Sequence, residues 1–217
     1  MGMFLRRGAV STGPKLGDLD VGTLVKLNEN GSPVEFYVAK HDYESALNGS
    51  GLTLLVRKDC YAQSNGYSNA DADFAGGALD TLLNDTYFPI LDSGIQNKIP
   101  LTKIYYTHYA DYTWTLTTLE RKVFPLSVTE FGKSDTYANT EGSALPIASS
   151  LQIAQFNGTA VVQWTRTVYT NTQGYAYALL ATGAVKEFGK GMPTYYARPA
   201  FCLPAETKVG DGNLITG

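Results

Sequence analysis

Alternating apolar and polar positions dominate the first quarter of the chain. Residues 23–27 are strand-like and residues 34–40 alternate, with Asn30-Gly31 between them as a strong signal for a hairpin turn. A third apolar run occupies residues 52–57, after a loop rich in Gly and Ser. The pattern therefore predicts a β-hairpin that is followed by a third strand.

The periodicity then becomes helical. Apolar side chains recur at helical spacing over residues 78–83, and Pro89 ends or kinks that element. Residues 92–99 predict a second short helix, capped by Asp92 or Ser93. The pattern predicts no other helix.

The rest of the chain returns to β-type patterning around one long loop. Residues 132–158 have loop composition, and a long loop inside a compact domain is often functional. A turn is predicted at Thr182-Gly183. The predicted strands of this region are 102–107, 122–128, 161–166, 175–181, 184–188 and 197–203. We therefore predict an α+β fold of mixed antiparallel sheets with two short helices and long loops.

The length of the chain and the positions of its Gly and Pro residues indicate a single main domain. The chain has 217 residues, which favours one domain with short appendages. Gly and Pro interrupt residues 1–20, which we interpret as an attachment or oligomerisation segment. The domain proper is predicted over 21–204, and 205–217 is interpreted as a C-terminal tail.

Composition narrows the class of protein. Only 17% of residues are charged, so Ser, Thr, Asn, Gln and Tyr supply much of the surface polarity, as in an extracellular or virion protein. The net charge of -3 argues against a nucleic-acid partner. No apolar run approaches the ~20 residues of a membrane span, and the N-terminus lacks the apolar stretch of a signal peptide. A phage structural protein needs no such signal, because lysis releases it.

Cysteine and histidine offer few routes to catalysis. Cys60 and Cys202 end β-like runs, and we interpret them as buried apolar thiols, with a disulfide between the two strands as the alternative. His41 and His108 do not have the spacing of a zinc site, so no metal or other cofactor is predicted. A Cys60–His nucleophile stays open as a weaker alternative.

Two groups of oxygen-bearing residues are further candidate chemical sites. Residues 69–73 superficially resemble the start of a calcium loop, but a helix N-terminus with favourable carboxylates is the better interpretation. Asp42 and Glu44 are a carboxylate pair of the kind that a glycan-acting enzyme uses. The pattern is generic, and we assign no catalytic residue.

Tyrosine is the most informative residue type, with fifteen in the chain. Its ring and hydroxyl make adaptable binding surfaces at a small cost in conformational entropy. Tyr175 and Tyr177 alternate with Ala, which indicates packing within a strand. Tyr169, Tyr195 and Tyr196 lie in loops rich in Gly, Thr and Pro, where exposure is expected.

A frame of anchors surrounds two of these loops. Trp164 and Phe201 are predicted core residues, while Arg166 and Arg198 are predicted to make buried hydrogen bonds with acids or backbone carbonyls. Residues 167–174 and 189–196 lie between the anchors and are rich in Thr, Tyr, Asn and Gly. A rigid frame around polar, aromatic loops predicts a binding site.

Several segments together resemble a family of uncharacterised domains from Firmicutes gut bacteria and their phages. The most specific part is the pattern Trp-x-Arg, Gly-x-Val, Arg-Pro-Ala-Phe. These segments are Phe36–Tyr43, Leu54–Tyr61, Ala138–Ser143, Trp164–Arg166, Gly183–Val185 and Ala197–Phe201. Tyr196-Ala197 stands where the family commonly has Gly-Val.

The resemblance implies a C-type-lectin-like fold. The family is similar to formylglycine-generating enzymes and to the variable proteins of diversity-generating retroelements, including phage major tropism determinants. The oxidase activity is not implied, because a copper-binding cysteine pair is needed and only Cys202 lies in the C-terminal region. The resemblance instead implies a non-enzymatic, receptor-binding protein of a phage tail tip or tail fibre.

The implied ligand contacts come from the region between the anchors. They are Thr167, Tyr169, Asn171, Gln173, Tyr175, Lys186, Phe188, Thr194, Tyr195 and Tyr196. Gln173 and Lys186 are weaker candidates, because the adenine-directed mutagenesis of Asn codons in such proteins does not yield Gln or Lys. The implied partners are a host surface protein or glycan, other phage tail proteins and further copies of the chain. A structural virion or cell-surface subunit is the alternative.

Overall fold

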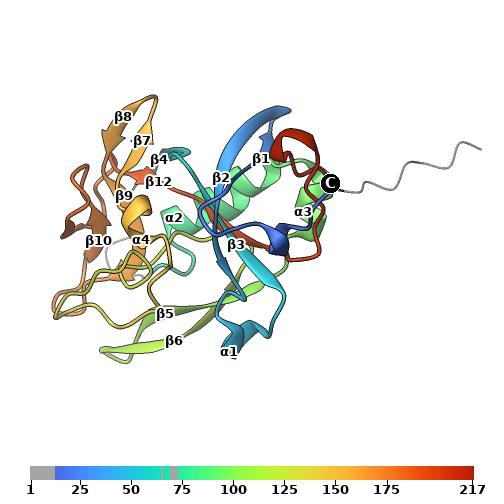
Figure 1. Ribbon diagram of the computed structural model, residues 1–217. Helices are drawn as coiled ribbons and strands as arrows, with labels where there is room; N and C mark the ends of the chain where they lie inside the picture. The colour runs from blue at the N-terminus through green and yellow to red at the C-terminus, as the bar shows by residue number, and fades with distance from the viewer. Residues whose placement is uncertain (1–12, 65, 69–72) are drawn as a thin grey trace, which may run out of the picture.

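A four-stranded antiparallel sheet joins the beginning of the chain to its end. The computed structural model describes residues 13–64, 66–68 and 73–217. The strands, in spatial order, are β1 (Leu24–Glu29), β2 (Ser32–His41), β3 (Leu52–Arg57) and β13 (Ala200–Pro204). Their buried side chains alternate along β1, as expected for a half-buried strand, and are nearly continuous along the inner strand β3 and the edge strand β13. Figure 1 shows these strands beside the helices of residues 78–98.

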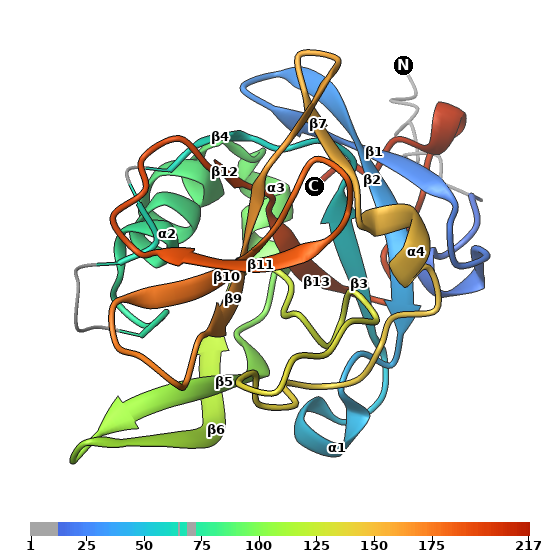
Figure 2. The ribbon, with the colours of Figure 1, turned by 90° about the vertical axis from the view of Figure 1, so that its left-hand side faces the viewer.

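A second, five-stranded sheet presents the C-terminal part of the chain. Its order is β11 (Val185–Gly189), β10 (Tyr175–Leu179), β9 (Gln163–Val168), β12 (Tyr196–Ala197) and β4 (Ala62–Gln63). β9 and β12 are parallel, while the other neighbours are antiparallel. Two separate hairpins complete the β-structure, β5–β6 and β7–β8, and they are visible in Figure 2. Their strands are β5 (Thr102–Ala110), β6 (Thr113–Arg121), β7 (Ala154–Phe156) and β8 (Thr159–Val161).

The helices are short, and the two predicted ones are present. The first changes pitch along its length and runs without a break from Ala78 to Ile90, and Pro89 lies in its last turn. The second follows Asp92 at the N-cap. The helical segments are η1 (Leu16–Asp18), α1 (Ser45–Asn48), α2 (Ala78–Thr81), η2 (Leu82–Tyr87), η3 (Phe88–Ile90), α3 (Ser93–Lys98), α4 (Ala148–Leu151) and η4 (Asp211–Asn213). The fold is therefore α+β with mostly antiparallel sheets, and α1 and α4 are additions to the prediction.

Turn chemistry explains both a success and a failure of the predicted strands. Asn30 and Gly31 both have positive φ (48° and 76°), so the predicted hairpin turn is confirmed. The strand predicted over 122–128 is wrong, because that segment pairs only through the Phe124–Ala200 bridge. Its neighbour β6 was missed because the β5–β6 turn uses Asp111 and Tyr112 at positive φ, a pair that is not a usual turn signal.

Both ends of the described chain pack onto the domain. Leu16, Val209 and Ile215 are fully buried. The amide of Leu16 donates to the carbonyl of Thr207 (2.8 Å), and the amide of Ile215 donates to that of Lys26 (2.8 Å). Residues 16–20 and 205–217 thus pack against the domain that is predicted over 21–204. The first twelve residues lie outside the described part of the chain.

The core contains the anchors that the sequence predicts. Trp164 and Phe201 are buried, and the rings of Phe36 and Phe201 lie 5.4 Å apart. Cys60 and Cys202 are free, buried thiols, so the interpretation as small apolar side chains is confirmed. Burial raises the pKa of Cys60 to about 12. Across the described residues, no helix is long and apolar enough to cross a bilayer.

Candidate functional site

A buried arginine connects β9 to the long loop that precedes it. The Nη1 atom of Arg166 donates to Oε2 of Glu130 (2.6 Å) and to the carbonyl of Pro125 (3.0 Å). Its Nε donates to the carbonyl of Tyr105 (2.7 Å). Burial by itself would lower the pKa of Arg166, but Glu130 holds that pKa above its ordinary value. The predicted pairing of Arg166 with acids and carbonyls is confirmed.

A second buried acid extends this network. Glu141 accepts a hydrogen bond from the hydroxyl of Thr107 at Oε1 (2.7 Å) and from that of Thr167 at Oε2 (2.8 Å). Thr167 also accepts from the amide of Val128 (3.0 Å). Thr167 is fully buried, so its predicted place on a ligand-contact surface is wrong. The hydroxyl of Thr167 belongs to the scaffold because a buried carboxylate needs hydrogen-bond donors.

Arg198 ties together three backbone segments from the other side. It donates to the carbonyls of Arg57 (2.7 Å), Lys58 (2.6 Å) and Leu151 (2.6 Å). Burial lowers the pKa of Arg198, because its charge lies among carbonyls instead of a paired acid. Arg198, like Arg166, is thus buried and hydrogen-bonded to backbone carbonyls, as the sequence predicts.

Four tyrosine rings meet at one end of β9 and β10, and we call Tyr137, Tyr169, Tyr175 and Tyr177 the tyrosine cluster. The ring of Tyr169 lies 5.3 Å from that of Tyr137, 6.3 Å from that of Tyr175 and 5.6 Å from that of Tyr177. Tyr177 is buried, whereas Tyr137 and Tyr175 are 41% and 42% exposed. The cluster therefore has a buried base and an aromatic, solvent-facing top.

Hydrogen bonds fix the loops that carry the tyrosine cluster. The hydroxyl of Tyr177 donates to Oδ1 of Asp135 (2.5 Å), which also accepts from the amide of Tyr137 (3.0 Å). Thr170 donates to the carbonyl of Tyr137 from its amide (2.9 Å) and from its hydroxyl (2.8 Å). The amide group of Asn171 donates to the hydroxyl of Tyr169 (3.3 Å). These bonds orient the exposed rings before any ligand arrives.

The structure brings four of the predicted contacts together at this cluster. Tyr169 and Tyr175 are members, while Asn171 and Gln173 are exposed in the loop between them. Tyr137 belongs to the cluster but was not predicted as a contact. The signal that pointed to it was the loop composition of 132–158, which contains it.

Three other predicted contacts, Lys186, Phe188 and Tyr195, lie on the opposite face of the sheet. Tyr175 stands opposite Gly189 in the β10–β11 pair and Phe188 stands opposite Ala176, so the two side chains point to different faces. The ring of Tyr195 lies 4.7 Å from that of Phe188 and 5.1 Å from that of Trp164. Phe188 and Tyr195 therefore cover the core. Lys186, above the ring of Phe188, is exposed on that side, and Thr194 is also exposed.

Tyr196 lies at a third location, beside β4 and the β7–β8 hairpin. It pairs with Gln63 of β4, whose amide donates to the Tyr196 hydroxyl (3.2 Å), and its ring lies 4.8 Å from that of Phe156 on the β7–β8 hairpin. The ten predicted contacts thus do not form one surface. Only the group at the tyrosine cluster is both exposed and contiguous.

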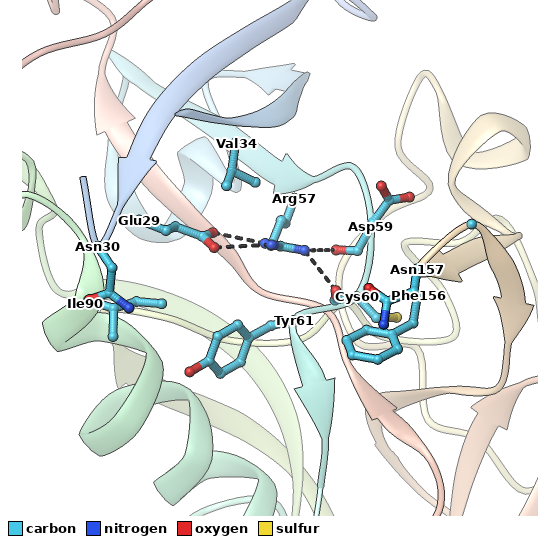
Figure 3. A pocket seen from close by; sticks show the side chains of 11 residues that line it. Glu29, Asn30, Val34, Arg57, Asp59, Cys60, Tyr61, Ile90, Phe156 and Asn157 are labelled. Carbon is cyan, nitrogen blue, oxygen red and sulfur yellow. Dashed lines mark hydrogen bonds and ion pairs between the residues drawn. The ribbon is translucent and has the colours of Figure 1, made fainter. Parts of the chain in front are cut away.

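A pocket of about 420 Å³ lies between the tips of the β1–β2 and β7–β8 hairpins (Figure 3). Glu29 and Arg57 form one wall, Tyr61 and Phe156 contribute aromatic rings, and Asn157 stands at the tip of the second hairpin. The sequence reasoning missed this pocket. The signal available was the dipeptide Asn-Gly, which occurs at both hairpin turns, but the sequence does not show that the two turns meet.

The candidate catalytic residues have structural roles. Oδ1 of Asp42 accepts the amide of Gly51 (2.7 Å), and Glu44 pairs with Lys40 (3.2 Å). Nε2 of His41 donates to the carbonyl of Leu19 (2.8 Å), which leaves Nδ1 to accept from the Thr53 hydroxyl (3.0 Å). These bonds explain the positions of Asp42, Glu44 and His41 without a substrate.

His108 and the acidic segment 69–73 meet at β5. Nδ1 of His108 pairs with Oδ2 of Asp73 (2.5 Å), and Oδ1 of Asp73 accepts the amide of Ala75 (3.0 Å). Residues 69–72 lie outside the described part of the chain, so the interpretation of this segment as a helix N-terminus stays a prediction. In the described part of the chain, the hydrogen bonds of the two histidines involve neither cysteine.

The fold and the sites together define an α+β domain in which side-chain hydrogen bonds, rather than regular secondary structure, hold long loops in place. The chain belongs to the family described as Domain of unknown function (DUF6273), which matches residues 50–205. This range contains β3, the tyrosine cluster and β13. Searches of curated proteins and of solved structures found no match.

Proposed function

We propose that this chain is a non-enzymatic ligand-binding protein and that the tyrosine cluster, with Asn171 and Gln173, is its binding surface. The observation that carries the proposal is the combination of exposure and order at this surface. Tyr137 and Tyr175 are 41% and 42% exposed, yet hydrogen bonds to Asp135 and Thr170 fix the backbone and ring that support them. Aromatic groups that are already ordered lose little entropy on binding.

The proposed ligand is a protein or glycan on the surface of a host cell. Flat tyrosine rings supply apolar contact area, and the neighbouring amide groups of Asn171 and Gln173 supply hydrogen bonds to a polar partner. In this proposal the chain is a receptor-binding protein of a phage tail tip or tail fibre, or a variable protein diversified by a retroelement. It acts on the virion or outside the cell, next to other tail proteins.

We further propose that the fold is C-type-lectin-like. The last long strand, β13, lies beside β3 from the first quarter of the chain. The separate sheet of β9, β10 and β11 carries the loops of the binding surface. The buried positions of Trp164, Arg166 and Phe201 agree with the roles that the resemblance implies for them.

The proposal is tested with a double substitution, Tyr137→Ala with Tyr175→Ala, in fluorescently labelled protein. Binding to Firmicutes gut strains and to their envelope fractions is measured by flow cytometry and sedimentation. We expect the double variant to lose at least about tenfold in binding to every strain that the wild type binds, because central aromatic contacts carry much of an interface energy.

The matched control is Tyr112→Asn, which removes a 96% exposed tyrosine at the tip of the β5–β6 hairpin. Asn tolerates the positive φ of 60° at that position. We expect wild-type binding from this control. Equal binding by the wild type and the double variant, with both folded by circular dichroism, would contradict the proposed surface.

A structural virion or cell-surface subunit is the second candidate. The β5–β6 hairpin exposes Tyr112 (96%) and Leu116 (41%), and β6 is mostly exposed along its length. Exposed apolar groups on a projecting hairpin suit contact with a neighbouring subunit. A stable oligomer that Leu116→Lys dissociates, in light scattering coupled to gel filtration, favours this candidate over the first.

A further inference from the structure

The pocket between the two hairpin tips has the composition of a ligand site. Its walls come from segments that are far apart in sequence: the β1–β2 hairpin, the start of β4 and the β7–β8 hairpin. Figure 3 shows Tyr61 across the cavity from the ion pair of Glu29 and Arg57, with Phe156 and Asn157 at one side. None of its lining residues belongs to the tyrosine cluster.

The charges of its inner wall neutralise one another. Arg57 donates from Nε to Oε1 of Glu29 (2.8 Å) and from Nη2 to Oε2 (3.0 Å), a bidentate pair. Its Nη1 donates to the carbonyls of Asp59 (2.9 Å) and Cys60 (2.7 Å), while Tyr87 donates to Glu29 (2.7 Å). This wall is therefore polar and rigid but carries no net charge to attract an ion.

The rim of the pocket offers two neutral amide groups and one carboxylate. Asn30 and Asn157 each occupy the first position of an Asn-Gly turn, with φ of 48° and 51°. Both are exposed, and within the described part of the chain their amide side chains make no hydrogen bonds. An amide has donors and an acceptor, so the two tips present both to a ligand between them. The carboxylate of Asp59 adds an acceptor at the rim.

Aromatic rings complete the pocket. Tyr61 is half-buried with its ring 4.9 Å from that of Tyr87, and Phe156 is half-buried with its ring 4.8 Å from that of Tyr196. These contacts hold both rings in place while one side of each lines the cavity. A rigid ring beside amide groups suits a ligand that has both C–H faces and hydroxyl groups.

We propose that this pocket binds a neutral saccharide. The C–H faces of a sugar ring would pack on Tyr61 and Phe156, and its hydroxyls would exchange hydrogen bonds with Asn30, Asn157 and Asp59. A second hollow of about 400 Å³ shares Val34, Arg57 and Asp59 with the pocket, so a chain of linked sugars can extend along the surface. Its Lys58 is also paired, with Glu35 (2.7 Å), which again favours an uncharged ligand.

The test is a titration of the ¹⁵N-labelled full chain, followed by heteronuclear NMR. The neutral probes are glucose, galactose, N-acetylglucosamine and their β1,4-linked disaccharides, with glucuronate and tetramethylammonium as anionic and cationic probes. We expect at least one neutral probe to shift the side-chain amide signals of Asn30 and Asn157, with the disaccharide binding more tightly than its monomer. Neither charged probe should compete.

The diagnostic variant is Asn30→Gly with Asn157→Gly, which removes both amides but keeps residues that accept positive φ. We expect saccharide affinity to fall by about fivefold or more. The matched control, Asp111→Gly, makes the same kind of change at φ 49° in the β5–β6 turn, and its affinity should be unchanged.

Three results would contradict saccharide binding at this pocket. The proposal is overturned if no neutral probe shifts these signals, or if the double glycine variant binds saccharide with unaltered affinity. It is also overturned if tetramethylammonium binds more tightly than every neutral probe. The Tyr137→Ala and Tyr175→Ala variant should retain saccharide affinity at this pocket. The result is therefore separate from the outcome of the cell-binding experiment.

Discussion

Arg166 shows how one buried side chain organises a surface that it does not reach. It lies in β9, and its partners Glu130 and Glu141 both belong to the irregular loop between β6 and α4. The same loop carries Tyr137 into the tyrosine cluster. A buried charge with several fixed acceptors specifies the path of an irregular loop, because any other path would leave the charge unpaired.

Replacing Arg166 by Met should lower the free energy of unfolding by about 3–5 kcal/mol, because Glu130 and Glu141 would remain buried without their cation. Urea denaturation followed by fluorescence measures this change. Lys58→Met is the control, since its pair with Glu35 is 40% and 38% exposed and should contribute less than about 1 kcal/mol. Similar values for the two variants would show that Arg166 does not organise the loop.

Glu141 should make stability depend on pH in a definite direction. Burial raises the pKa of Glu141, although Arg166 opposes the shift. The folded state then binds this proton more tightly than the unfolded state, so the contribution of Glu141 to stability falls as pH rises above its ordinary pKa. Urea titrations between pH 4 and 8 should show the wild type losing stability relative to Glu141→Gln as pH rises. The opposite trend would contradict the assigned shift.

At the scale of elements, turn chemistry accounts for two hairpins that the sequence predicted, although Asn157-Gly158 at the β7–β8 turn was not recognised as a third. Asn30-Gly31 marked the β1–β2 hairpin, and Thr182-Gly183 marked the β10–β11 turn, where the amide of Leu180 donates to the carbonyl of Ala184 (2.8 Å). The turn at Asp111 and Tyr112 contains no glycine, and Tyr is not a usual residue at positive φ, so β6 was missed. Side chains that adopt positive φ only because a hairpin requires it are not recognised from sequence alone.

Alanine substitutions at two glycines should distinguish the free-energy cost of backbone strain from that of steric overlap. Gly31 has φ +76° with open space around it, whereas a Cβ at Gly66 (φ +96°) would lie 2.8 Å from the carbonyl oxygen of Lys190. Gly31→Ala should cost about 1 kcal/mol from φ alone, and Gly66→Ala roughly 2–4 kcal/mol. Thermal denaturation by circular dichroism measures both. Equal losses would mean that the Lys190 backbone moves away freely.

The site was less predictable than the scaffold. The anchors Trp164, Arg166 and Arg198 follow from residue type, because a large apolar ring or an arginine within a β-run is normally buried with partners. The grouping of the contacts depends on which face of β10 and β11 each side chain occupies, and the register that decides this comes from tertiary structure. Tyr137 joins them only because its loop folds back onto Thr170.

At the scale of the whole molecule, the chemical reactivity of the two buried thiols measures whether the fold has opened. Burial raises the pKa of Cys60 to about 12 and also raises that of Cys202, so neither supplies a reactive thiolate in the folded chain. Ellman's reagent at pH 8 should label neither thiol rapidly in native protein and both in 6 M guanidinium. Rapid labelling of native protein, lost in Cys60→Ala, would show that the pocket between the two hairpin tips opens locally.

The pairing of β3 with β13 also sets the order of events during folding. Leu54 stands opposite Cys202, so β3 pairs with a strand that is synthesised long after it. Contacts between such distant segments are slow to form, since a long loop must close first. We expect the nascent chain to remain incompletely folded on the ribosome until β13 has emerged. Until then, the exposed edge of β3 is available to chaperones or to misassembly.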